Sequence, residues 1–139
     1  MTKNNREIPI KIQNKSLPRI LLVEDDSSSR NITTIALKKI CEVDIAENGE
    51  TAVKLAGLNK YPLILMDIAL GYSMNGIDAT KIIRKIPDYK KIPIVALTAF
   101  AMEGDKEIFL SQGMTHYLAK PFDIIDLQNL ISSLLLNSK

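Results

Sequence analysis

Cysteine is nearly absent from this chain, which has one, Cys41, among 139 residues. A single thiol cannot form an internal disulfide or build a cysteine-ligated metal site, and this usage favours a reducing compartment. Long apolar runs are also missing, because none approaches the roughly 20 residues that span a bilayer. Residues 1–13 lack the compact apolar core of a signal peptide. We therefore expect a cytoplasmic protein with no membrane segment in this chain.

A strong charge of either sign is absent as well. The sequence holds 18 Lys and Arg against 16 Asp and Glu, and no dense basic cluster that would follow a phosphate backbone. Direct nucleic-acid binding is therefore not expected. The length of 139 residues suits one domain with a normal core. We assign the polar, lightly basic residues 1–17 to a tail or linker and residues 18–139 to the domain.

Several apolar runs of this chain end on polar side chains. Three of them can be strands buried on both faces, as in a parallel sheet. The carboxyl ends of parallel strands form the crevice where ligands bind, so the residues that follow are the first candidates for function. After the three buried runs these residues are Glu24, Asp25 and Asp26 (after 19–23), Asp67 (after 62–66) and Thr98 (after 93–97). A fourth segment, 115–119, is followed by Lys120.

Strand-like and helix-like segments alternate along the domain. We predict five strands, near residues 19–24, 43–46, 62–67, 93–98 and 115–119, alternating with five helices. In the first helix, near 27–39, we expect an N-cap among Ser27 to Ser29 and an apolar stripe of Ile32, Ile35, Ala36 and Ile40. Such alternation indicates right-handed crossovers and a sheet covered on both faces. The predicted fold is an α/β protein, a three-layer α/β/α sandwich.

Three carboxylates are expected to crowd together at one edge of this sheet. Glu24, Asp25 and Asp67 follow two predicted strands, and like charges at a few ångströms cannot all stay ionised without compensation. A hard divalent cation that keeps several waters is the natural remedy, and Mg²⁺ suits it best. The alternative is an acidic cap that interacts only with helix N-termini. Asp26 is expected to contact the first helical turn instead.

Asp67 can also act as a nucleophile. A carboxylate attacks phosphorus when a metal ion and an ammonium group spread the negative charge of the transferring group. Lys120 is placed to supply that ammonium as a point charge. Thr98 can offer its hydroxyl to a phosphoryl oxygen.

Four ordered blocks of the chain resemble the signature motifs of two-component response-regulator receiver domains. They are Leu21 to Asp26, Leu65 to Asp67, Leu97 to Ala99 and Lys120 to Phe122. The resemblance implies a flavodoxin-like (βα)₅ fold with a parallel five-stranded sheet in the order 2-1-3-4-5. It further implies Asp67 as phosphoacceptor, Thr98 and Lys120 as phosphoryl contacts, Glu24, Asp25, Asp67 and the Ala69 carbonyl as Mg²⁺ ligands, Thr98 and Tyr117 as switch residues, and a cis Lys120–Pro121 bond.

The resemblance also implies partners. A histidine kinase or a histidine phosphotransfer domain would supply the phosphoryl group, and a phosphorylation-dependent homodimer is allowed. We expect no turnover by the isolated domain beyond Mg²⁺-dependent self-phosphorylation and slow autodephosphorylation. The chain would be either a stand-alone regulator or the receiver of a hybrid histidine kinase, which the loop after Asp67 favours. That loop, residues 68–76, lacks the family's proline and is one residue longer than usual.

Three other readings stay open on the residues alone. An aspartate-nucleophile phosphohydrolase usually has a second aspartate two residues after the nucleophile, where this chain has Ala69. A degenerate receiver would act by binding only, although no signature residue is missing here. A flavin mononucleotide carrier would need a phosphate loop after the first strand, where Glu24 and Asp25 would repel a phosphate.

Overall fold

The computed structural model describes residues 17–70, 74–99 and 105–137. Five parallel strands form one sheet in the order β2-β1-β3-β4-β5, which confirms the predicted order. Most of the predicted tail, residues 1–16, lies outside the described residues, and the boundary at residue 17 stays a prediction. The strands are β1 (Arg19–Val23), β2 (Glu42–Ala46), β3 (Ile64–Asp67), β4 (Ile94–Thr98) and β5 (His116–Ala119).

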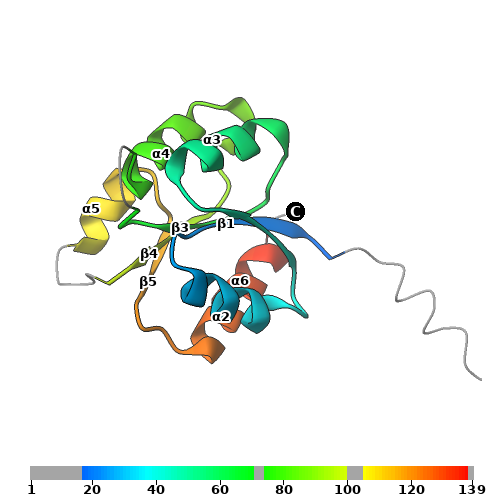
Figure 1. Cartoon of the computed structure of the whole chain (residues 1–139). Helices are drawn as coiled ribbons and strands as arrows, with labels where there is room; N and C mark the ends of the chain where they lie inside the picture. The colour runs from blue at the N-terminus through cyan, green and yellow to red at the C-terminus, as the bar shows by residue number, and fades with distance from the viewer. Residues whose placement is uncertain (1–16, 71–73, 100–104, 138–139) are drawn as a thin grey trace, which may run out of the picture.

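Helices cover both faces of this sheet. Figure 1 shows α2 and α6 on one face and α3 and α4 on the other. Helix α5 contributes Phe109 to the core on the α3–α4 face. The three-layer α/β/α sandwich is thereby confirmed. The helices are α2 (Ser27–Leu37), α3 (Gly49–Leu58), α4 (Gly76–Arg84), α5 (Asp105–Ser111) and α6 (Ile124–Leu136), with a short 3-10 helix η1 (Pro87–Tyr89).

The central strands are buried on both faces, as their unbroken apolar runs predict. Every residue of β3 and β4 is buried, and so are four of the five residues of β1. Their side chains alternate between two core clusters, one on each side of the sheet. The strands are therefore held rigidly, and the polar residues at their carboxyl ends have fixed starting points.

The inward face of the first helix was predicted only in part, because Ala36 and Ile40 meet the core but Ile32 and Ile35 do not. Ile32 and Ile35 are 53% and 72% exposed, whereas Thr33, Ala36 and Leu37 are buried. Both sets have helical spacing, and they share Ala36, so periodicity alone did not distinguish them. The N-cap is Asp26, whose carboxylate accepts a hydrogen bond from the Ser29 amide at 2.8 Å. None of the three serines caps the helix, but the predicted contact of Asp26 with the first turn is confirmed.

Arg84 joins three segments at the end of the sheet where the strands begin. Its Nε and Nη2 donate to the carbonyl oxygen of Gly113 at 2.9 and 2.7 Å. Its Nη1 donates to the carbonyl oxygens of Tyr89 and Ile92 at 2.7 and 2.8 Å. Gly113 has a φ of +104°, as expected for a residue that ends α5 in the left-handed region. The clamp thus joins α4, the η1–β4 loop and the α5–β5 turn.

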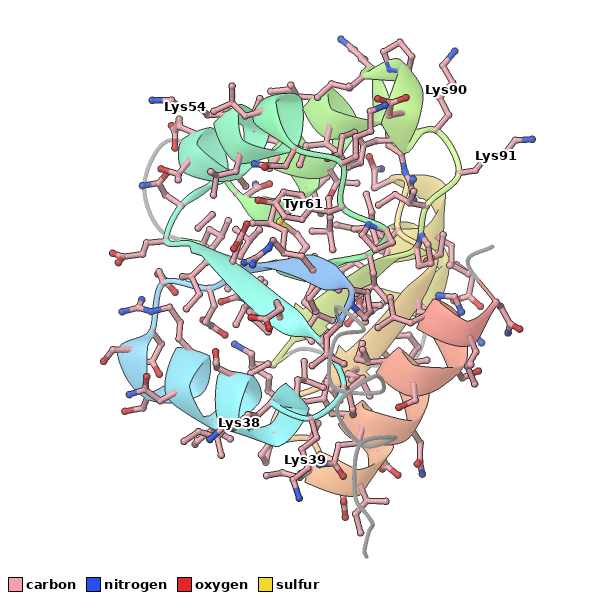
Figure 2. The ribbon with its side chains drawn as sticks, turned by 90° about the vertical axis from the view of Figure 1, so that its right-hand side faces the viewer. Lys38, Lys39, Lys54, Tyr61, Lys90 and Lys91 are labelled. Carbon is pink, nitrogen blue, oxygen red and sulfur yellow. The ribbon has the colours of Figure 1, made fainter. Side chains whose placement is uncertain are left out.

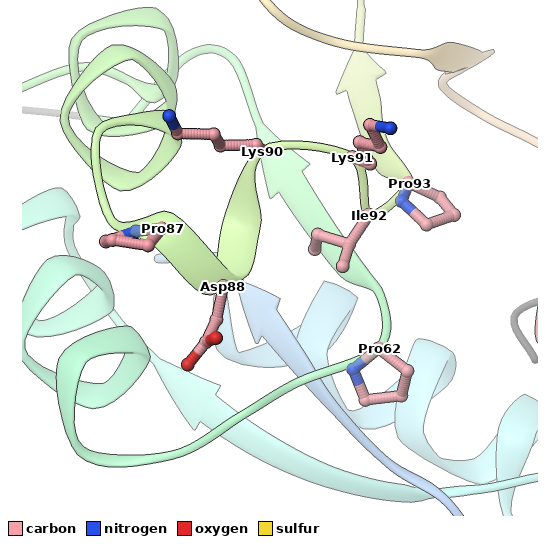
Figure 3. Close-up of a pocket in the computed structure, with 7 residues that line it drawn as sticks. All are labelled: Pro62, Pro87, Asp88, Lys90, Lys91, Ile92 and Pro93. Carbon is pink, nitrogen blue, oxygen red and sulfur yellow. The ribbon is translucent and has the colours of Figure 1, made fainter.

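Basic side chains gather where the strands begin. Figure 2 faces this end of the sheet, and Lys38, Lys39, Lys90 and Lys91 reach outward around it. A hollow of about 550 Å³ lies at the starts of β3 and β4. Figure 3 shows residues that line it, among them Pro62, Lys90 and Lys91. Helix C-termini point toward this end, and cations there complement their dipoles. This hollow lies at the end of the sheet opposite the carboxyl ends of the strands.

Two glycines of the helices have opposite surroundings. A Cβ at Gly76, the first residue of α4, would overlap the backbone carbonyl oxygen of Asp67. The helix therefore begins in direct contact with the end of β3. A Cβ at Gly57 in α3 would meet nothing within 4 Å beyond its own turn of helix. The same substitution should therefore have opposite effects at the two positions.

We predict that Gly76→Ala lowers the free energy of unfolding by about 1–3 kcal/mol, because the backbone of β3 or α4 must shift to admit the methyl group. Gly57→Ala should raise it by about 0.4–1 kcal/mol, because alanine restricts the unfolded chain without a clash in the fold. Urea unfolding of both variants beside the wild type measures this. Equal midpoints for Gly76→Ala and the wild type would contradict the close approach of α4 to Asp67.

Candidate functional site

The three predicted carboxylates converge at the carboxyl edge of the sheet. Glu24 and Asp25 follow β1 directly, and Asp67 is the last residue of β3. These strands are neighbours, with Val23 paired to Met66. One carboxylate oxygen from each of the three residues lies within 4.8 Å of the others. Residues 42 and 43 positions apart in the sequence thus supply one cluster of negative charge.

Lys120 approaches this cluster from the far side of β4. Its Nζ lies 2.7 Å from Glu24 Oε1 and 3.4 Å from Asp67 Oδ2. The backbone amide of Lys120 donates to the carbonyl oxygen of Thr98 at 2.7 Å, which fixes its position relative to β4. The following Lys120–Pro121 peptide bond is cis, as the sequence resemblance implied. The predicted cation therefore does meet the predicted acids.

The electrostatics of the cluster show a shortage of positive charge. Glu24 and Asp67 are only 1% and 4% exposed, whereas Asp25 is exposed. Burial, followed by the neighbouring Asp67, raises the pKa of Glu24 to about 7 despite the opposing effect of Lys120. Burial alone would lower the pKa of Lys120, but Glu24 and Asp67 together raise it. One ammonium group does not fully compensate these carboxylates.

Backbone amides orient two of the carboxylates. Asp67 Oδ1 accepts a hydrogen bond from the amide of Ala69 at 3.0 Å. Glu24 Oε2 accepts one from the amide of Asp26 at 3.3 Å. The amide of Ile68 donates to the carbonyl oxygen of Leu97 at 3.0 Å, so the ladder between β3 and β4 continues one residue beyond Asp67. The carboxylates are thereby held in place before any ligand arrives.

The remaining predicted residues lie along the same edge. Thr98 ends β4 and is 1% exposed, between the strand that carries Asp67 and the strand that precedes Lys120. Tyr117 is half-buried in β5 and packs against the core cluster on the α3–α4 face. Ala69 is exposed in the loop after β3. Residues 71–73 of that loop lie outside the described residues, so its predicted extra length stays untested.

The donor set fits a hard divalent cation. All three groups offer carboxylate oxygens, the ligands that Mg²⁺ prefers in proteins. The exposed Asp25 leaves one side of the cluster open to water, which Mg²⁺ retains when it binds.

Sequence reasoning missed one residue that contacts this cluster's backbone. Arg30, in α2, donates from Nη1 to the carbonyl oxygens of Glu24 and Asp25 at 3.3 and 3.1 Å. Its place one turn into the helix after the acidic pair was a usable signal. A side chain there can fold back over the loop that precedes the helix.

Comparison with known proteins agrees with the geometry. The model of the family described as response regulator receiver domain matches residues 20–132. The histidine-protein kinase BarA of Escherichia coli is 34% identical over 130 residues, which cover 93% of this chain and 14% of BarA. Hybrid signal transduction histidine kinase G of Dictyostelium discoideum is 42% identical over 118 residues, 82% of this chain and 3% of that kinase. The chain therefore spans a small part of these curated relatives.

No helix in the described part of the chain is long and apolar enough to cross a bilayer.

Solved structures agree with the family match. The receiver domain of sensor histidine kinase PA1611 from Pseudomonas aeruginosa has a TM-score of 0.80 and 36% identity, over 88% of this chain and 100% of that one. That structure has a magnesium ion coordinated in its active site cleft. Chemotaxis protein CheY4 of Vibrio cholerae has a TM-score of 0.79 and 27% identity, over 86% and 99% of the two chains. The chain belongs to the family of response regulator receiver domains.

Proposed function

We propose that Asp67 is the residue of this receiver domain that accepts a phosphoryl group from a phosphohistidine of a partner. One observation carries the proposal: Asp67 lies in a cluster with two other carboxylates while the Lys120 ammonium stands 3.4 Å from its Oδ2. In the reaction a carboxylate oxygen of Asp67 forms a bond to phosphorus as the phosphorus–nitrogen bond of the donor breaks. The imidazole nitrogen keeps the electron pair and takes up a proton.

The surrounding residues have separate roles in this proposal. Lys120 stabilises the negative charge of the transferring group as a point charge. The Ala69 amide holds one oxygen of Asp67, so the carboxylate is oriented for attack. Thr98 donates its hydroxyl to a phosphoryl oxygen. Because these groups are positioned by buried strands, little reorganisation is needed at the moment of transfer.

Glu24, Asp25 and Asp67 would hold Mg²⁺, with the carbonyl oxygen of Ala69 as a further ligand. A bound Mg²⁺ supplies charge neutralisation at the phosphoryl oxygens. The magnesium ion in the PA1611 receiver supports this assignment. The exposed Asp25 carboxylate lies on the side of the cluster that is open to solvent.

The same arrangement counts against a phosphohydrolase. Turnover needs a general acid near the leaving group, and the position two residues after Asp67 carries the methyl group of Ala69. The amide of Ala69 is already bonded to Asp67 Oδ1. The matching family model describes receiver domains, and the relatives named above are histidine kinases. The complete, converged site likewise argues against a degenerate receiver.

We propose that the phosphodonor docks on a groove beside Lys120. The groove encloses about 400 Å³ between α2 and the segment after β5, and Ile32, Thr33 and Phe122 line it with Lys120. Ile32, which is 53% exposed, supplies apolar surface at the rim of this groove. A histidine-bearing helix that covers the rim can reach Asp67.

The matches to BarA and to hybrid kinase G support a place for this chain within a hybrid kinase.

The predicted switch residues, Thr98 and Tyr117, lie on β4 and β5. We propose that Thr98 moves toward the phosphoryl group and that Tyr117 turns inward behind it, which changes the face formed by α5, β5 and α6. Tyr117 is half-buried and packs against the core cluster on the α3–α4 face. Ile108 and Leu110 of α5 are 52% and 43% exposed and supply apolar surface for a phosphorylation-dependent homodimer.

Incubation with acetyl phosphate and Mg²⁺ should add one phosphoryl group to the chain, because Asp67 is oriented and Lys120 stands beside it. Intact-mass spectrometry measures the gain. Asp67→Asn and a Mg²⁺-free sample should show none. The same phosphorylated sample in sedimentation velocity reports the homodimer.

A gain that persists in Asp67→Asn would place the acceptor elsewhere and contradict the assignment. Consumption of acetyl phosphate without a trapped adduct would favour the phosphohydrolase. No gain in a folded protein would leave a receiver that acts by binding only.

Metal-free protein should lose stability as pH rises through about 7. The pKa of Glu24 is raised in the fold from 4.5 to about 7, so its stabilising contribution is fully present below about 4.5 and disappears as the carboxyl ionises. Urea unfolding between pH 5 and 8 in chelator measures this loss, and Glu24→Gln should show a smaller one. Saturating Mg²⁺ should reduce the loss in the wild type. Identical pH profiles for wild type and Glu24→Gln would contradict this origin.

Ile32→Asp should slow phosphotransfer from the partner kinase, found by phosphotransfer profiling, at least tenfold, a factor equivalent to about 1.4 kcal/mol of docking energy. Phosphorylation by the small donor phosphoramidate should be unchanged, because it needs no docking surface. Leu58→Asp is a matched control, since Leu58 is 71% exposed on α3 in the other helical layer. Equal transfer to Ile32→Asp and Leu58→Asp would rule out docking at the α2 groove.

A further inference from the structure

Arg30 is a largely buried cation that the proposed phosphotransfer does not use. Its side chain is 17% exposed and folds back from α2 over the loop between β1 and α2. Nη1 donates to the carbonyl oxygens of Glu24 at 3.3 Å and of Asp25 at 3.1 Å. Nη2 lies 3.9 Å from the carboxylate of Glu47, in the loop between β2 and α3. One guanidinium thus contacts the backbone of both acidic residues.

The position of this loop decides where two of the three carboxylates stand. The amide of Glu24 makes a hydrogen bond across the sheet, to the carbonyl oxygen of Ala46 at 3.0 Å. Beyond it the chain leaves the sheet, and the Asp26 cap starts α2 two residues later. Nη1 carries two N–H groups fixed in the plane of the guanidinium, so this one nitrogen can hold two successive carbonyl groups at once. Asp67, by contrast, is fixed by the strand that it ends.

We infer that Arg30 is a positioning residue for the metal ion: it fixes the β1–α2 loop so that Glu24 and Asp25 meet Mg²⁺ together with Asp67. This inference rests on the proposed function of the carboxylate cluster. Arg30 acts through the backbone carbonyls, and no carboxylate of the cluster is its hydrogen-bond partner among the described residues. Residues that orient metal ligands in this way commonly control metal affinity.

A simple charge effect predicts the opposite result. Arg30 carries a positive charge near the cluster, so Coulomb repulsion alone would make Mg²⁺ bind more tightly once the charge is removed. Positioning predicts weaker binding after removal, because the loop then samples arrangements that separate the carboxylates. The direction of the change in affinity therefore distinguishes the two effects. A merely structural contact would change the unfolding temperature and leave the affinity of the folded protein unaltered.

The test is isothermal titration of Mg²⁺ into the full chain, with thermal unfolding measured on the same samples. We expect Arg30→Ala to weaken Mg²⁺ binding roughly 10- to 100-fold, the usual range for such residues. Arg30→Lys keeps the charge but loses the planar pair of N–H donors. Its affinity for Mg²⁺ should therefore lie between those of the wild type and Arg30→Ala. Glu47→Gln removes only the long contact to an exposed carboxylate and should bind nearly as the wild type does.

Unchanged or tighter Mg²⁺ binding by folded Arg30→Ala would overturn the inference. Should that variant fail to fold, Arg30→Lys decides: wild-type affinity overturns the inference and weaker affinity supports it. Failure of the proposed metal site gives a different result, because the wild type itself would then bind no Mg²⁺. The titration therefore separates an error about Arg30 from an error about the cluster.

Discussion

The mutual repulsion of three carboxylates is the constraint on which this molecule depends. Glu24, Asp25 and Asp67 bring oxygen atoms within 4.8 Å of one another, and two of these residues are almost fully buried. Lys120 relieves part of the repulsion, but the pKa of Glu24 stays raised. Such a cluster persists only on a rigid frame. Its carboxylate oxygens are the ligands that Mg²⁺ prefers, and phosphoryl transfer to a carboxylate uses such an ion to neutralise charge.

The frame is the order of the strands. β1 and β3 are neighbours although β2 lies between them in the sequence, so the chain reverses its direction across the sheet at β1. This reversal places α2 on one face and α3 on the other, as Figure 1 shows. The crevice that opens above β1 and β3 is the usual ligand position in open parallel sheets. The carboxylates stand at that crevice because both strands end there.

Close backbone contacts complete the frame around the cluster. Gly76 lets α4 begin against the carbonyl group of Asp67, and the Asp26 side chain fixes the start of α2. Arg30 holds the loop between β1 and α2. In each contact one partner is a backbone atom, so the contact depends on the path of the chain as well as on the residue that meets it.

The apolar runs and the polar residues at their ends determined the layers and the identity of the clustered acids, because strands buried on both faces have unbroken apolar runs. The strand order was implied by the resemblance of four sequence blocks to receiver domains, and the structure has that order. The sequence did not determine the inward face of α2, since Ile32–Ile35 and Thr33–Leu37 satisfy the same helical period. Tertiary structure alone decided that face, the backbone contacts of Arg30 and the fit of Gly76 against Asp67. The face of α2 depends on which side chains the sheet and α6 meet, and a periodic pattern within one helix carries no information about its neighbours. The contacts of Arg30 and Gly76 depend on the path of the backbone, which the apolar pattern does not specify.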